Sequence, residues 1–167
     1  MSRLWIAARS IVYATIFLAA WGWVAFACRR LDKFIPFQVP EWLETPGIAL
    51  GPAGAVLALT TIFLFIYDGR GTPAVFDRPK RFVPHGPYRL VRNPMYIGGI
   101  LMLLGLGCYL ESIAMVLYAG LVFLLIHTFV VLVEEPGLRK RFGENYVAYC
   151  HAVPRWIPSI TGRRIPR

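Results

Sequence analysis

The sequence is short of charge, of cysteine and of histidine. Only 16% of its 167 residues are charged and 57% are hydrophobic, whereas about 25% of an average soluble domain is charged. This composition excludes an ordinary soluble protein. The three cysteines and three histidines are widely scattered, which argues against a disulfide framework and against a metal site. The chain also lacks a GxGxxG turn after a strand, which is the fingerprint of a dinucleotide-binding site.

The hydrophobic residues are arranged in long uncharged runs. A membrane-spanning helix needs about 20 mostly apolar residues. We predict four spans, near residues 11–28, 48–67, 95–110 and 113–133. Only Glu111 and Ser112 separate the last two runs, so these runs must form an antiparallel helical hairpin. We therefore expect a single all-α integral membrane domain over residues 1–167, with a cytoplasmic loop and tail that carry the site.

The distribution of basic residues predicts the orientation. Lysine and arginine favour the cytoplasmic side of a membrane. With four spans, fifteen of the eighteen basic residues fall on one side, in the N-terminal segment, the 69–93 loop and the tail. We expect both termini to be cytoplasmic, most simply at the inner membrane of a bacterium. This bias and anionic headgroups explain the net charge of +9 without a nucleic-acid partner.

Two polar signals should meet at the cytoplasmic face. The first precedes the third predicted span, where Arg92 and Asn93 lead into Pro94. Proline suits the first turn of a helix, asparagine caps it, and such a helix start attracts a carboxylate or phosphate. The second signal is Glu134 and Glu135, which we place at the solvated end of the fourth helix. Their carboxylates would accept hydrogen bonds from hydroxyl or ammonium donors.

The catalytic residues are not fixed by these patterns. Glu134, Arg92 and His127 are candidates, and His127 lies two turns before Glu134 on roughly the same helix face. An ionisable residue at membrane depth is a functional hypothesis by default. The alternative is a neutral histidine bonded to a neighbouring helix. In the same way, the arginines could be orientation markers only, and the glutamates a solvated helix end.

An ordered set of short motifs carries a family resemblance. The set comprises residues 86–98, Glu134-Glu135-Pro136, Leu138, Phe142-Gly143, Tyr146, Tyr149 and Val153-Pro154-Arg155. In order and spacing it resembles the integral-membrane methyltransferases that include isoprenylcysteine carboxyl methyltransferase and the phospholipid N-methyltransferases. The resemblance covers a core of about residues 69–158. It implies S-adenosylmethionine as the methyl donor, bound on the cytoplasmic side.

The resemblance also implies roles for individual residues. The positions that look like cofactor contacts are Gly69, Gly71, Val83, Tyr88, Asn93, Pro94, Tyr96, Glu134 and Glu135. We expect Arg92 and Arg155 to bind the substrate. The prenylcysteine branch usually has histidine at position 93 and arginine at position 131, where this chain has Asn93 and Val131. The acceptor is therefore open between a phospholipid amine and a prenylcysteine-like carboxylate.

Two other functions fit the same composition. Sterol reductases share a related C-terminal membrane architecture and use NADPH, and they would need more arginines clustered near the site. A non-catalytic membrane binding or assembly protein would leave the polar residues at the helix ends without a ligand. The expected partners are a lipophilic substrate and membrane lipids. Nothing in the sequence indicates the oligomeric state.

Overall fold

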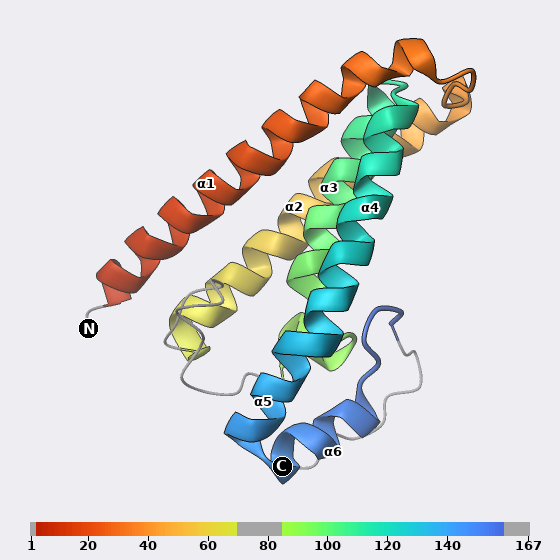
Figure 1. Ribbon diagram of the computed structural model, residues 1–167. Helices are drawn as coiled ribbons and strands as arrows, with labels where there is room; N and C mark the ends of the chain where they lie inside the picture. The colour runs from red at the N-terminus through yellow and green to blue at the C-terminus, as the bar shows by residue number, and fades with distance from the viewer. Residues whose placement is uncertain (1–2, 70–84, 159–167) are drawn as a thin grey trace.

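The computed structural model describes residues 3–69 and 85–158. Within these residues the chain is all-helical and has no strand, as the sequence predicts. The helices are α1 (Arg3–Cys28), α2 (Glu44–Leu64), α3 (Pro94–Tyr109), α4 (Ile113–Phe129), α5 (Glu135–Phe142) and α6 (Glu144–Ala152). Figure 1 shows α2, α3 and α4 side by side, with α1 leaning away from α4 and approaching it near the link between α3 and α4.

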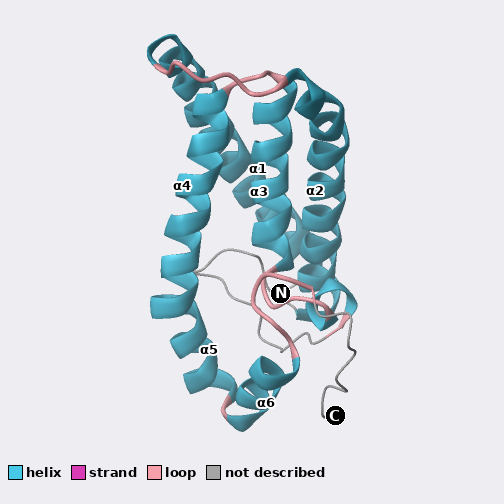
Figure 2. Cartoon of the chain, turned by 90° about the vertical axis from the view of Figure 1, so that its right-hand side faces the viewer, coloured by secondary structure: helices cyan, strands magenta, loops and turns pink. Residues whose placement is uncertain are grey.

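The four long helices run in alternating directions. The turns η1 (Arg29–Phe34) and η2 (Glu41–Leu43), which follow α1, lie at the same end as the link between α3 and α4. The start of α3 and the two short helices α5 and α6 lie at the other end, as both views show (Figures 1 and 2). This second end, which we call the α5–α6 end, therefore collects the polar segments predicted to meet.

Three helical stretches in the described part of the chain are long and apolar enough to cross a membrane. They are Ala7–Phe34, Glu41–Tyr67 and Ile113–Phe142. The third predicted span is present as α3, but its 16 residues extend only about 24 Å. Large apolar side chains such as Trp23 and Leu124 point outward, with 74% and 60% of their surface exposed. These features fit a protein surrounded by lipid.

Helices α2 and α3 pack backbone against backbone. A Cβ atom added to Gly54 would lie 2.5 Å from the carbonyl oxygen of Gly98, and one added to Gly98 would lie 2.7 Å from the oxygen of Gly54. Further along, a Cβ on Gly105 would lie 2.5 Å from the Gly51 nitrogen. Small residues allow this close approach, which van der Waals packing rewards in a membrane. The interface fixes where α3 begins relative to α2.

The hairpin between α3 and α4 is confirmed. The Glu111 amide donates to the Cys108 carbonyl and the Ser112 amide to the Gly107 carbonyl, at 3.1 and 2.9 Å. This pair of bonds is a Schellman motif, with Glu111 at the left-handed position (φ 52°). The Ser112 hydroxyl then accepts from the Met115 amide and caps α4. The chain reverses within three residues, so α3 and α4 are antiparallel neighbours.

The prediction that the fourth helix ends at the glutamate pair is wrong. A π-helical turn, η5 (Val130–Glu134), joins α4 to α5, and the helix continues to Phe142. The cause is Pro136, which has no amide hydrogen and whose ring would clash with the carbonyl four residues back in a regular α-helix. The wider turn accommodates it: the Glu135 amide donates to Val130, five residues back. Glu134 and Glu135 thus lie inside a continuous helix.

Candidate functional site

The start of α3 is tied to the C-terminal segment. Pro94 is the first residue of α3 and is buried, and Asn93 occupies the N-cap position. The Asn93 side chain makes no capping hydrogen bond, so the predicted cap is absent. Its amide nitrogen instead donates to the Arg155 carbonyl at 3.3 Å. The Arg92 amide donates to the Pro154 carbonyl at 2.9 Å. We call residues 153–156 the C-terminal strap.

The π turn separates the two glutamates. A π turn holds more residues per turn than an α-helix, so it rotates the residues that follow it. Glu134 is directed to α3, where its Oε2 accepts a hydrogen bond of 2.9 Å from the Tyr96 hydroxyl. Glu135 and His127 both contact the strap. His127 and Glu135 thus contact the same C-terminal segment, whereas the hydrogen bond of Glu134 is to α3.

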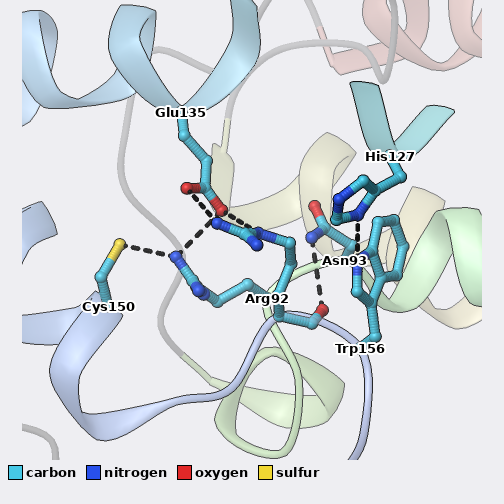
Figure 3. Close-up of polar contacts among 7 residues, drawn as sticks. Arg92, Asn93, His127, Glu135, Cys150 and Trp156 are labelled. Carbon is cyan, nitrogen blue, oxygen red and sulfur yellow. Dashed lines mark hydrogen bonds and ion pairs between the residues drawn. The ribbon is translucent and has the colours of Figure 1, made fainter. Parts of the chain in front are cut away.

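Glu135 is the centre of a buried ion cluster (Figure 3). Its Oε1 lies 2.9 Å from Arg92 Nη1 and 2.8 Å from Arg155 Nε, and its Oε2 accepts from Arg155 Nη2 at 2.9 Å. Only 6% of the Glu135 side chain is exposed, so this residue is not at a solvated helix end as predicted. Bidentate pairing with arginine is a strong, geometrically specific interaction. Glu135 thereby joins α5, the loop before α3 and the strap.

The cluster carries more positive than negative charge. Two guanidinium groups face one carboxylate, and the hydrogen bond to Glu135 raises the pKa of Arg155 above its ordinary value. Arg92 Nη1 also donates to the Cys150 sulfur at 3.0 Å. Arg92 Nε is buried and has no hydrogen-bond partner among the described residues. A buried donor of this kind is costly unless a ligand accepts from it.

Helix α6 packs against the first residue of the strap. Tyr146, Tyr149 and Val153 are buried together. The Tyr149 hydroxyl donates to the Tyr88 carbonyl at 2.7 Å. Burial raises the pKa of the Tyr149 hydroxyl, so it remains a protonated donor at neutral pH. The strap is thus fixed on both sides, by α6 and by the loop that leads into α3.

His127 is bound to the last residue of the strap. Its Nδ1 accepts a hydrogen bond of 3.0 Å from the Trp156 indole nitrogen, and Phe123 packs edge-on against the indole. An indole N–H can only donate, so Nδ1 is unprotonated and the neutral ring carries its proton on Nε2. His127 is therefore oriented as a hydrogen-bond donor toward any further partner. Because the indole occupies Nδ1, the arrangement does not favour His127, one of the predicted catalytic candidates, as a group that takes up a proton.

The remaining predicted cofactor contacts lie around the same end. Tyr88, in the turn η4 (Gly86–Arg89), is buried and stacks on Phe65 with ring centroids 5.5 Å apart. Gly69 is the last residue of the π turn η3 (Phe65–Gly69), which follows α2. Gly71 and Val83 lie outside the described residues.

Cys150 and Trp156 contact the site directly but were not among the predicted site residues. Both act through side-chain partners far away in sequence, Arg92 and His127. A tryptophan in a basic tail and a lone cysteine have no spacing signal that would single them out. The strap carbonyls that accept hydrogen bonds from Arg92 and Asn93 also have no signal in the sequence.

Comparison with known proteins identifies a family. A family model described as phospholipid methyltransferase matches residues 44–145, from α2 to the start of α6. The chain belongs to this family. The family consists of membrane methyltransferases that use S-adenosylmethionine, and its match confirms the resemblance seen in the sequence.

Two curated relatives carry names of a different kind. The chain is 34% identical over 122 residues to the cobalt-zinc-cadmium resistance protein CzcN of Cupriavidus metallidurans, an alignment that covers 72% of this chain and 53% of that protein. It is 25% identical over 122 residues to the nickel-cobalt-cadmium resistance protein NccN of Alcaligenes xylosoxydans xylosoxydans, covering 72% and 54%. The chain spans about half the length of these relatives.

Proposed function

We propose that this protein transfers a methyl group from S-adenosylmethionine to the headgroup amine of a phospholipid. The observation that carries the proposal is the meeting of the α3 start, the π-broken helix α4–α5 and the strap at one end of the molecule. A soluble cofactor can reach that end from the cytoplasm, while a lipid reaches it along the apolar helices. The match to the phospholipid methyltransferase family supports this function.

The residues at this end suit the cofactor. S-adenosylmethionine supplies an activated methyl group, so the protein has to align the reactants and exclude water. Arg92 Nε is a buried donor without a partner in the described structure, which suits the carboxylate of the cofactor. Phe65, which stacks on the buried Tyr88, offers an aromatic surface. The carboxylate of Glu134 offers an acceptor for hydroxyl donors.

The two glutamates receive different roles in this proposal. Both oxygens of Glu135 are already occupied by arginines, so we assign it to positioning Arg92 and Arg155. Glu134, bonded to Tyr96, is the carboxylate that contacts ligands. A carboxylate there attracts an ammonium headgroup and can take the proton that an amine must lose before methylation. Val131, where the prenylcysteine branch has arginine, also favours an amine over a carboxylate.

The test uses purified protein in detergent. Calorimetry should show binding of S-adenosylhomocysteine and none of NADPH, and labelled S-adenosylmethionine should label phosphatidylethanolamine in mixed micelles. Glu134→Gln should reduce labelling strongly, whereas Thr128→Val, which removes an exposed hydroxyl on α4, should leave it unchanged. Binding of NADPH alone would transfer the assignment to a reductase. Cofactor binding without labelling of any amine lipid would reject the proposed acceptor.

The relatives suggest a physiological setting. Both are named for resistance to divalent metals, and we propose the same setting for this chain. Loss of the protein should lower the tolerance of its host to cadmium or cobalt. Parent protein should restore growth on these metals and Glu134→Gln should not, which would link the phenotype to the methyltransferase site.

A further inference from the structure

His127 is the one described site residue placed well inside the apolar part of its helix. It precedes Glu134 by seven residues, which corresponds to about 10 Å along the axis. Its ring neighbours are the aromatic side chains of Phe123 and Trp156, and the same helical stretch carries lipid-exposed leucines: Leu124, Leu125 and Leu132 expose 60%, 56% and 67% of their surface. An ionisable side chain at such a depth is costly and is usually retained for a function.

The hydrogen bond from Trp156 leaves His127 with one unused donor. Because the indole occupies Nδ1, the proton of the neutral ring is on Nε2. The described residues provide His127 with no second hydrogen-bond partner. A polar N–H in an apolar environment lowers the free energy of the complex when a ligand oxygen accepts from it. The ligand class is thus a lipid with an acceptor oxygen at this depth.

The depth identifies which oxygen of a phospholipid this is. In the proposed function the headgroup amine lies at Glu134, about 10 Å from His127 along the helix. From that nitrogen to an ester carbonyl of the glycerol a phospholipid has about nine bonds of roughly 1.5 Å, which project to about 10 Å in a partly extended chain. The phosphate is too close to the amine to reach His127, and the acyl tails carry no acceptor.

We propose that His127 donates a hydrogen bond from Nε2 to an ester carbonyl of the acceptor lipid, with Trp156 as the residue that fixes its tautomer. This inference rests on the proposed function and adds a specificity determinant to it. The pair selects diacyl phospholipids over dialkyl ether lipids, which lack the carbonyl. The same hydrogen bond also fixes the depth of the lipid in the membrane relative to the start of α3.

The experiment compares two phosphatidylethanolamines with the same chain length, one with ester and one with ether linkages, in mixed micelles. The parent should use the ester lipid with about three- to tenfold higher kcat/KM, as expected for one net hydrogen bond. His127→Phe should lower this ratio to about one. His127→Gln, which can both accept from the indole and donate, should retain most of the preference. Trp156→Phe should reduce it.

The controls separate this role from a structural one. Thr128→Val changes the neighbouring residue on α4 and should leave the ester-to-ether ratio unchanged. The affinity for S-adenosylhomocysteine should be the same in His127→Gln and the parent. Equal use of the two lipids by the parent, or an ester preference that survives His127→Phe, overturns the inference and leaves the proposed function intact. If neither lipid is methylated, both are rejected.

Discussion

At the scale of single residues, the adjacent glutamates Glu134 and Glu135 have the same side chain but different bonding partners. Glu135 is buried between Arg92 and Arg155, whereas Glu134 is bonded to Tyr96 on a different helix. The difference comes from backbone geometry, since the π turn directs consecutive side chains to different neighbours. A buried carboxylate held by two guanidinium groups acts mainly on structure. The carboxylate beside it is bonded to Tyr96, and the proposed function gives it the contact with ligands.

Glu135→Gln should destabilise the protein. The substitution keeps the size of the side chain but leaves two partly buried guanidinium groups without a counter-charge. Removing one partner of a fully buried ion pair costs about 3–5 kcal/mol, and we expect about 2–3 kcal/mol because Arg155 is partly solvated. Thermal unfolding in detergent should show a clearly lower Tm.

Glu134→Gln is the matched control for that measurement. It should change the Tm much less and weaken binding of S-adenosylhomocysteine about tenfold to a hundredfold, where each factor of ten corresponds to ~1.4 kcal/mol. If Glu135→Gln melts like the parent, the ion cluster contributes no stability. If Glu134→Gln binds the cofactor product as tightly as the parent, the ligand-contacting role given to Glu134 is wrong.

Tyr149 should make the stability of the protein sensitive to alkaline pH. Burial raises the pKa of its hydroxyl, so the folded state keeps a proton that the unfolded state loses near pH 10. The unfolding free energy therefore falls as the pH rises above about 10. Tyr149→Phe loses the bond to the Tyr88 carbonyl, at a cost of about 1 kcal/mol at neutral pH, and removes part of the alkaline dependence. A Tm series from about pH 8 to 11 measures both, and parallel curves for parent and variant would contradict this.

At the scale of elements, the sequence was sufficient to predict the apolar helices, the α3–α4 hairpin and the meeting of its polar ends. The helices follow from the length of the apolar runs, and the hairpin follows from the short link between the last two runs, which leaves room for no other geometry. The contacts of Arg92 with Glu135 and of Tyr96 with Glu134 agree with that expectation. The π turn could not be predicted, because a proline after two glutamates resembles a helix end. The strap contacts depend on tertiary packing, which has no local sequence signal.

The α2–α3 interface should respond sharply to single methyl groups. Gly98→Ala would place a Cβ 2.7 Å from the Gly54 carbonyl oxygen, so the helices must separate. Overpacking of this kind costs about 1–3 kcal/mol. Gly99→Ala, one residue further along, meets nothing within 4 Å and should leave the Tm unchanged or slightly higher. Equal Tm values for the two variants would show that α2 and α3 are not in direct backbone contact.

At the scale of the whole molecule, the site is assembled from three distant parts of the chain. Arg92 and Asn93 precede α3, Glu134 and Glu135 follow α4 at the π turn, and Arg155 belongs to the strap. Each part lies at the α5–α6 end because the helices alternate in direction (Figure 1). The proposed function therefore requires this end to face the compartment that supplies S-adenosylmethionine.

The orientation of the α5–α6 end is the last expectation to test. Basic residues concentrate there, which favours the cytoplasmic side. Glu144→Cys places a thiol at an exposed position at the start of α6, and Glu41→Cys places one at an exposed position at the opposite end. In intact spheroplasts a membrane-impermeant maleimide should label position 41 above the parent's background, and position 144 only after lysis. The reverse pattern would put the site on the outer face, where the cytoplasmic cofactor could not reach it.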